Sequence, residues 1–140
     1  MHNSPILKQG RNCWRVARAE RFSFLIDADV YFRSLISAID QARHTVYISA
    51  WDINSRVRLS RSGNGPDSDI TLGAYLNEKA GQTPGLEIYI LCWDFSLIYT
   101  LEREFLPGWR LGSQTHERIH FHLDDEHPTG ASHHQKFVVV

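Results

Sequence analysis

The polypeptide has 140 residues, the size of one ordinary domain, and its 42% hydrophobic and 22% charged content excludes a disordered chain. The net charge of −1 disfavours a protein that coats a polyanion, and two cysteines are too few for a disulfide scaffold, which favours a reducing compartment. No apolar run is long enough to span a membrane, and the first residues lack the apolar core of a signal peptide. We therefore expect a cytoplasmic protein, with association with a membrane surface left open.

Predicted helices and strands alternate along the chain. The first helix begins at Asp27 or Asp29, either of which can cap it, and its apolar residues recur at spacings of four and three. The nearly continuous apolar run LEIYILCW indicates a strand that is covered on both faces. In chain order we expect a helix over 27–43, a strand over 45–51, a loop over 54–69, a helix over 71–79 that Gly81 ends, a strand over 86–93, a helix over 96–106, and strands over 118–123 and 134–140.

This alternation predicts an α/β fold, in which a parallel or mixed β-sheet is flanked by helices on both faces. Residues 1–22 are polar and basic without a clear period, so we expect an irregular lead-in followed by one domain over residues 23–140. The sequence stops within FVVV, a run suited to the interior of a sheet, whereas natural termini are usually polar and exposed. This ending predicts the N-terminal part of a longer protein, and a terminal edge strand of a complete small domain is the alternative.

Histidine is concentrated late in the sequence, where six of the eight histidines lie between residues 116 and 134. On a strand, His134 and Lys136 would project side by side from the same face. An imidazole nitrogen can attack phosphorus to give a phosphohistidine, and a neighbouring ammonium can bind the non-bridging oxygens and offset their charge. This pair therefore indicates phosphoryl chemistry, although the His-x-Lys triplet alone is also compatible with a solvent-facing strand end.

The residues around this pair resemble the phospholipase D superfamily, whose signature is His-x-Lys, four residues and then Asp. His134 and Lys136 fit that signature with residues 137–140 after them, and the aspartate would come next, where the sequence ends. FLIDADVYFRSLISAIDQARHTVYISAWDI is similar to the family's first helix and strand. LEIYILCWDFSLIYTLEREFLPGWRLG and RIHFHLDDEHPTGASHHQK look like the bacterial branch of phospholipase D and cardiolipin synthase, so the resemblance covers residues 23–140.

The resemblance implies an enzyme with two such motifs, one in each half of the protein, around one active site. It implies that His134 attacks a phosphodiester, that Lys136 binds the phosphate, and that the histidine of the second motif protonates the leaving alcohol. The implied substrate is a phospholipid, which is hydrolysed or transferred to an alcohol with no metal or other cofactor. Because the partner half with the second motif is not within residues 1–140, we expect this chain to be inactive alone and its whole protein to be active.

Other residues near the motif have two interpretations each. His133 should point to the opposite face of the strand from His134, where a supporting or packing role is favoured over direct chemistry, and it is also a candidate to bind substrate. Trp51 and Asp52 end one predicted strand, and Trp93 and Asp94 end another. At the carboxyl ends of parallel strands such residues can border a site and contact substrate, but the tryptophans can also pack in the core and the aspartates can cap helices.

Three alternatives compete with the phosphohistidine enzyme. A metal-dependent phosphoesterase or metal-binding module would use a set of side chains that zinc or manganese accepts: His116, His120, His122, Asp124, Asp125 and His127. A nuclease of the same superfamily, or contact with anionic headgroups, would use basic residues of the first half: Arg11, Arg15, Arg18, Arg21, Arg56, Arg58 and Arg61. The absence of an overall basic charge disfavours a nucleic-acid partner. A non-catalytic interaction domain is the third alternative.

Overall fold

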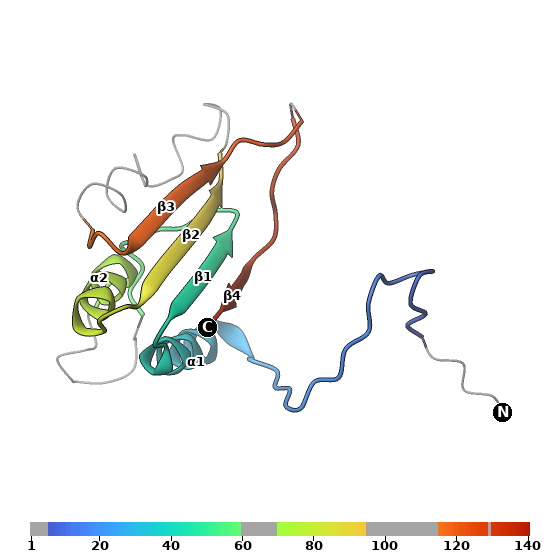
Figure 1. The fold of residues 1–140 in the computed structure, drawn as a ribbon, viewed down its shortest axis with the longest axis horizontal. Helices are drawn as coiled ribbons and strands as arrows, with labels where there is room; N and C mark the ends of the chain where they lie inside the picture. Colours follow the sequence, from blue (N-terminus) through green and yellow to red (C-terminus); the bar gives the residue numbers. More distant parts are fainter. Residues whose placement is uncertain (1–5, 60–69, 95–114, 129) are drawn as a thin grey trace.

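The computed structural model describes residues 6–59, 70–94, 115–128 and 130–140. Within these ranges the order of elements is α1 (Asp27–Gln41), β1 (Thr45–Ala50), α2 (Leu72–Gln82), β2 (Glu87–Trp93), β3 (Ile119–Asp124) and β4 (Phe137–Val139) (Figure 1). The sheet has the strand order β3-β2-β1-β4. The first three strands are parallel, and β4 runs antiparallel to β1 at the edge, so the predicted α/β fold with a mixed sheet is confirmed.

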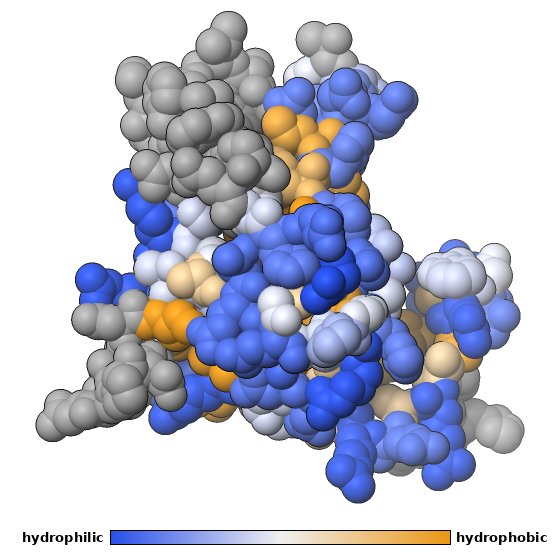
Figure 2. Space-filling view, turned by 60° about the vertical axis from the view of Figure 1, so that its left-hand side comes forward, coloured by the Kyte–Doolittle hydropathy of each residue, from blue (hydrophilic) through white to orange (hydrophobic). Residues whose placement is uncertain are grey.

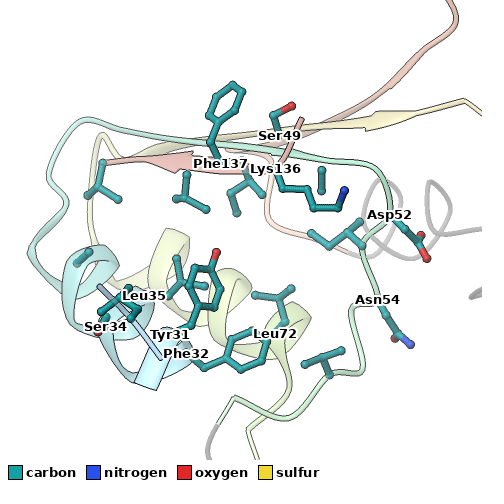
Figure 3. Close-up of a pocket in the computed structure, with 18 residues that line it drawn as sticks. Tyr31, Phe32, Ser34, Leu35, Ser49, Asp52, Asn54, Leu72, Lys136 and Phe137 are labelled. Carbon is teal, nitrogen blue, oxygen red and sulfur yellow. The ribbon is translucent and has the colours of Figure 1, made fainter. Parts of the chain in front are cut away.

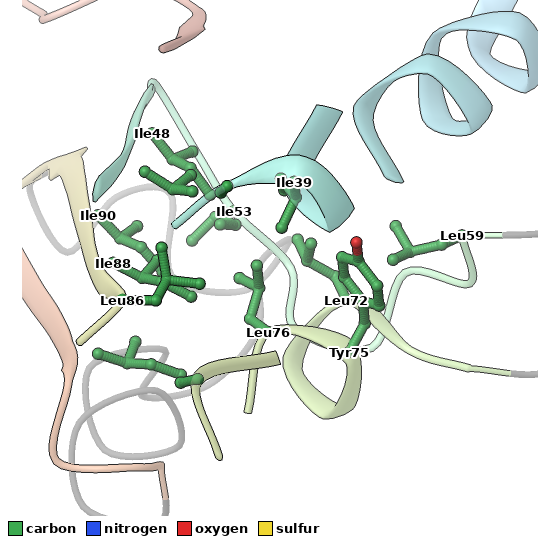
Figure 4. Close-up of a cluster of buried hydrophobic side chains, with 14 of the residues drawn as sticks. Ile39, Ile48, Ile53, Leu59, Leu72, Tyr75, Leu76, Leu86, Ile88 and Ile90 are labelled. Carbon is green, nitrogen blue, oxygen red and sulfur yellow. The ribbon is translucent and has the colours of Figure 1, made fainter. Parts of the chain in front are cut away.

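One face of the sheet carries the hydrophobic core. Side chains on a strand alternate between faces, and the parallel register puts Val46 beside Ile88 and Ile48 beside Ile90 on the same face. The helices α1 and α2 both pack on this face (Figure 4), where the most deeply buried side chains are Ile39, Val46, Leu76, Leu86, Ile88 and Ile90. The helix expected over 96–106 lies outside the described residues, and so does most of the loop expected over 54–69.

The ends of the two helices show how local chemistry sets their bounds. Asp27 has a left-handed backbone (φ 66°) and its carboxylate accepts hydrogen bonds from the backbone of Asp29 and Val30, so this aspartate caps α1 as predicted. The hydroxyl of Thr71 accepts from the backbone of Ala74 and caps α2. These caps leave fewer backbone N–H groups unpaired at the first turns.

The prediction that Gly81 ends the second helix is wrong, because α2 continues to Gln82. The guanidinium of Arg118 reaches the end of this helix and donates hydrogen bonds to the carbonyls of Ala80, Thr83 and Leu86. A distant side chain therefore satisfies carbonyls that the sequence suggested a glycine motif would satisfy. The turn into β2 is made later, by Gly85 in a left-handed conformation (φ 82°).

The strand expected over 134–140 is shorter than predicted, because β4 begins at Phe137. Pairing with β1 stops at the Ser49–Phe137 position, and β1 itself ends at Ala50. Residues before Phe137 therefore extend past the end of the neighbouring strand, where no backbone ladder is offered. His134 and Lys136 lie in this extended segment ahead of the strand, not within it.

Outside the core, the side of the molecule that carries α2 and β3 is largely hydrophilic (Figure 2). Residues 6–26 form neither a helix nor a strand of the sheet, and they run away from the sheet beside β4 (Figure 1). Among the described residues, no helix combines the length and apolar character needed to cross a membrane.

Candidate active site

The predicted catalytic pair lies where the carboxyl ends of the parallel strands β1, β2 and β3 meet, which we call the carboxyl edge of the sheet. Because β4 is antiparallel to β1, it begins at this same edge (Figure 1). Lys136 Nζ lies 3.1 Å from His134 Nδ1 and 3.2 Å from His134 Nε2, and both residues are exposed. The nearly equal distances mean that the ammonium singles out neither nitrogen. The ammonium also donates to the carbonyl of His134 at 3.2 Å, which keeps the lysine side chain close to the backbone of this segment.

His133 points away from this pair and ties its segment to the sheet. Its Nε2 is hydrogen-bonded to the hydroxyl of Ser49 on β1 at 3.0 Å. Its Nδ1 lies 3.3 Å from a carboxylate oxygen of Asp124 at the end of β3, within the range of an ion pair, and makes no hydrogen bond within the described part of the chain. We call Ser49, Asp124 and His133 the His133 clamp. Through it, two strands hold the residue that directly precedes His134.

A row of aromatic rings follows the carboxyl edge of the sheet. The rings of Trp51 and Trp93 are stacked with centroids 5.6 Å apart, and Trp51 also lies 5.7 Å from the ring of His134. Trp93 is buried and its ring lies 5.9 Å from that of His127. Trp51 therefore lies between His134 and the buried Trp93 at the end of β2. The structure thus brings this predicted site residue next to His134.

His127 is held by three groups at the same edge. Trp93 Nε1 donates to His127 Nε2 at 2.8 Å, which leaves the ring proton of the neutral imidazole on Nδ1, facing the carbonyl of Pro128 at 3.2 Å. The carbonyl of Asp94 also lies near Nε2, at 3.1 Å. The carbonyls of Pro128 and Asp94 favour the doubly protonated ring, and they raise the pKa of His127 above its ordinary value.

A cavity of about 650 Å³ opens beside the predicted lysine, between α1 and the strands β1 and β4. Lys136, Asp52 and Asn54 lie at one end of it, and the rest of the lining is mainly apolar (Figure 3). Phe137 points away from the cavity interior in the same view, because it belongs to the opposite face of the sheet. Asp52 thus stands at the same cavity end as Lys136.

For the metal alternative, no group of three His, Cys, Asp or Glu side chains that could hold a metal ion occurs among the described residues. His120 and His122 do share a face of β3, but His120 pairs with Glu87 at 2.7 Å and stacks on Tyr89. The backbone of His116 bonds to Asn77, beyond the other end of the strand. His120, Asp124 and His127 thus each have a different partner: Glu87, His133 and Trp93.

Sequence reasoning missed three contributors to this edge: Ser49, the use of Asp124 as a histidine partner, and the bond between Trp93 and His127. Asp124 and His127 stood out in the sequence only as candidate metal ligands. Ser49 could have been noticed in the sequence, because a serine within an apolar strand needs a polar partner when it is buried. Of the basic residues considered, Arg61 lies outside the described residues.

Known proteins of one family are similar in sequence to this chain. A family model described as Phospholipase D matches residues 38–104. Phospholipase D C of Dictyostelium discoideum is 32% identical over 118 residues, which cover 82% of this chain and 7% of that protein. Phospholipase D B of the same organism is 28% identical over 120 residues, covering 84% of this chain and 10% of that protein. Phospholipase D beta 1 of Arabidopsis thaliana is 36% identical over 63 residues, or 45% of this chain and 6% of that protein.

The chain belongs to the phospholipase D superfamily. It spans a tenth or less of the length of these curated relatives.

Proposed function

We propose that this chain supplies one catalytic half of a phospholipase D-like phosphodiesterase that acts on phospholipids through a covalent phosphohistidine. The observation that carries the proposal is the contact between Lys136 Nζ and the ring of His134, exposed at the carboxyl edge of the sheet and beside a cavity. This contact supports the proposal, because displacement at phosphorus can use an imidazole as nucleophile and an ammonium to bind the phosphate.

In the proposed reaction a ring nitrogen of His134 attacks phosphorus, and a nitrogen–phosphorus bond forms as the bond to the leaving alcohol breaks. Lys136 binds the non-bridging oxygens and offsets the charge that collects on them. The leaving oxygen takes its proton from the histidine of a second motif, which the superfamily resemblance implies. Water or an acceptor alcohol then attacks the phosphohistidine, loses its proton to the same group, and releases His134.

The lipid substrate is proposed from the relatives, whose names describe them as phospholipases D. Water as acceptor gives hydrolysis, and an alcohol gives phosphatidyl transfer of the kind that cardiolipin synthesis uses. Trp51 and Asp52 border the proposed substrate path, because one contacts His134 and the other lines the cavity with Lys136. The second half of the protein is the proposed partner, and a cytoplasmic location with contact to a membrane surface completes the proposal.

The test uses a phosphatidyl ester of p-nitrophenol, because nitrophenolate leaves without an added proton and so does not need the second motif. The 140-residue chain should release about one nitrophenolate per molecule in a burst and gain one phosphatidyl group, detected by intact-mass spectrometry at alkaline pH. His134→Ala should abolish both signals. His122→Ala is the matched control, because it removes an exposed histidine of β3 away from the pair and should leave the burst unchanged.

Each other outcome overturns a defined part of the proposal. A burst that survives in His134→Ala removes this histidine as nucleophile. A burst that EDTA abolishes indicates metal-dependent chemistry. Reaction with a nucleotide nitrophenyl ester but not with the lipid ester indicates a nuclease. Sustained turnover of ordinary phosphatidylcholine by this chain alone contradicts the need for a second motif.

A further inference from the structure

Residues 6–26, which we call the basic arm, hold five of the 15 Lys and Arg residues of the chain in one short segment. The arm has five basic residues against one acidic residue, a net charge of +4, whereas the other residues of the chain together carry −5. In the structure the arm runs away from the sheet without joining the core (Figure 1). The net charge of −1 for the whole chain therefore hides a positively charged segment that lies apart from the core and is accessible.

The basic arm also exposes large apolar side chains to an extent that a soluble surface does not explain. Trp14 is 85% exposed and Phe24 is 81% exposed. The arm's exposed large apolar residues are Ile6, Leu7, Trp14, Val16, Phe22, Phe24, Leu25 and Ile26. On the folded body, the side that carries α2 and β3 is largely hydrophilic (Figure 2). The body's own exposed large apolar residues are 38–53% exposed, less than most of those of the arm: Tyr31, Tyr47, Tyr89, Phe137, Val139 and Val140. Eight exposed large apolar residues within this one segment indicate a surface that binds something.

We propose that the basic arm binds the surface of membranes that contain anionic lipids. Arginine guanidinium groups pair with lipid phosphates, and aromatic rings with aliphatic side chains insert at the boundary between headgroups and acyl chains. Arg15 is adjacent to Trp14, and Arg21 is adjacent to Phe22, so charge and apolar surface alternate over the same few residues. The negatively charged remainder of the chain is repelled by such a surface, which confines the attachment to the arm.

The aliphatic residues decide between a membrane and a nucleic acid as the partner. Trp14, Phe22 and Phe24 could stack on exposed bases, but Ile6 and Ile26 have no flat face to stack and gain nothing from a phosphate backbone. An acyl boundary, in contrast, removes both aliphatic and aromatic side chains from water. This attachment gives the membrane contact of the proposed function a place in the chain, but it does not depend on the chemistry proposed for His134. Of the arm's residues, Leu25 lines the cavity beside Lys136, and the variants below do not change it.

The experiment measures co-sedimentation of the 140-residue chain with vesicles of phosphatidylcholine alone and of phosphatidylcholine with phosphatidylglycerol. Binding should require the anionic lipid and weaken as salt is raised. Each arginine near an anionic surface contributes about a fivefold change in partitioning, so Arg15→Gln with Arg18→Gln should reduce it about 30-fold. Trp14→Ala with Phe24→Ala should reduce it on the order of 100-fold, about tenfold for each lost ring.

The matched control is Arg33→Gln with Arg43→Gln, which makes the same change in net charge on exposed residues of the folded body and should alter partitioning by less than about twofold. Circular dichroism checks that each variant keeps its fold. The proposal fails if anionic vesicles do not retain the wild-type chain at low salt, or if the body variant loses as much binding as the arm variant. It also fails if the arm's arginines are needed for binding DNA or RNA, or for self-association, and not for binding vesicles.

Discussion

The bond between Ser49 and His133 should make a measurable contribution to stability. Ser49 is 6% exposed, so water does not readily replace His133 as the hydrogen-bond partner of its hydroxyl. Replacing a partner of a buried hydrogen bond costs about 1–3 kcal/mol, because the remaining polar group stays desolvated and unpaired. His133→Ala should therefore lower the free energy of unfolding by about 1–3 kcal/mol, or the melting temperature by about 3–10 °C in a chain of this size.

A double-mutant cycle separates this bond from the packing that each residue also loses. Ser49→Ala, His133→Ala and the double variant are unfolded in urea, and the coupling energy is expected at about 0.5–1.5 kcal/mol. His122→Ala serves as the control and should change stability by less than about 0.5 kcal/mol, because it is exposed on β3. Additive effects of the two single substitutions would refute the reasoning and reduce the His133 clamp to packing alone.

The remaining predictions concern groups outside the His133 clamp. Burial raises the pKa of the Tyr75 phenol, which donates to Asp40, so stability should fall as pH rises above about 10 and Tyr75→Phe should remove that loss in alkaline urea titrations. Arg118→Met should destabilise the chain by about 1–3 kcal/mol in urea unfolding, because the end of α2 loses its donor. The carbonyl of Pro128 raises the pKa of His127, so its NMR titration midpoint should lie above about 6.5, and its stabilising contribution should be lost as pH rises through that midpoint.

Most of the sheet could be predicted from local pattern. Strand β1 follows from a β-branched run, and β2 follows from an apolar run whose alternate members, Ile88 and Ile90, face the core. Asp27 at the start of α1 and Thr71 just before α2 cap these helices, as their side-chain chemistry suggests. These features depend on neighbours within a few positions, so a single sequence contains the information that sets them.

The contacts that shape the candidate site could not be predicted in the same way, because they join residues far apart in the chain. Ser49 and His133 are 84 positions apart, and Trp93 and His127 are 34 apart. The His-x-His spacing on β3 suggested a metal, but the side chain that meets His120 is Glu87 on the neighbouring strand. Strand order and register decide which residues pair across strands, and neither can be predicted from the residues next to them in the sequence.

Register also explains why the pair at the centre of the proposal has its present surroundings. Because Ser49 is paired with Phe137, odd-numbered residues of β4 share the face of Ser49, and Lys136 falls on the side of α1 and the cavity. The segment before β4 is anchored through His133 to that opposite face. His134 is therefore fixed between an anchor on one face of the sheet and a lysine on the other, at the point where β1 has ended and solvent can reach the ring. A slip of one residue in β4 would move Phe137 to the cavity side and take Lys136 away from it, so the geometry of the site depends on three residues of strand pairing.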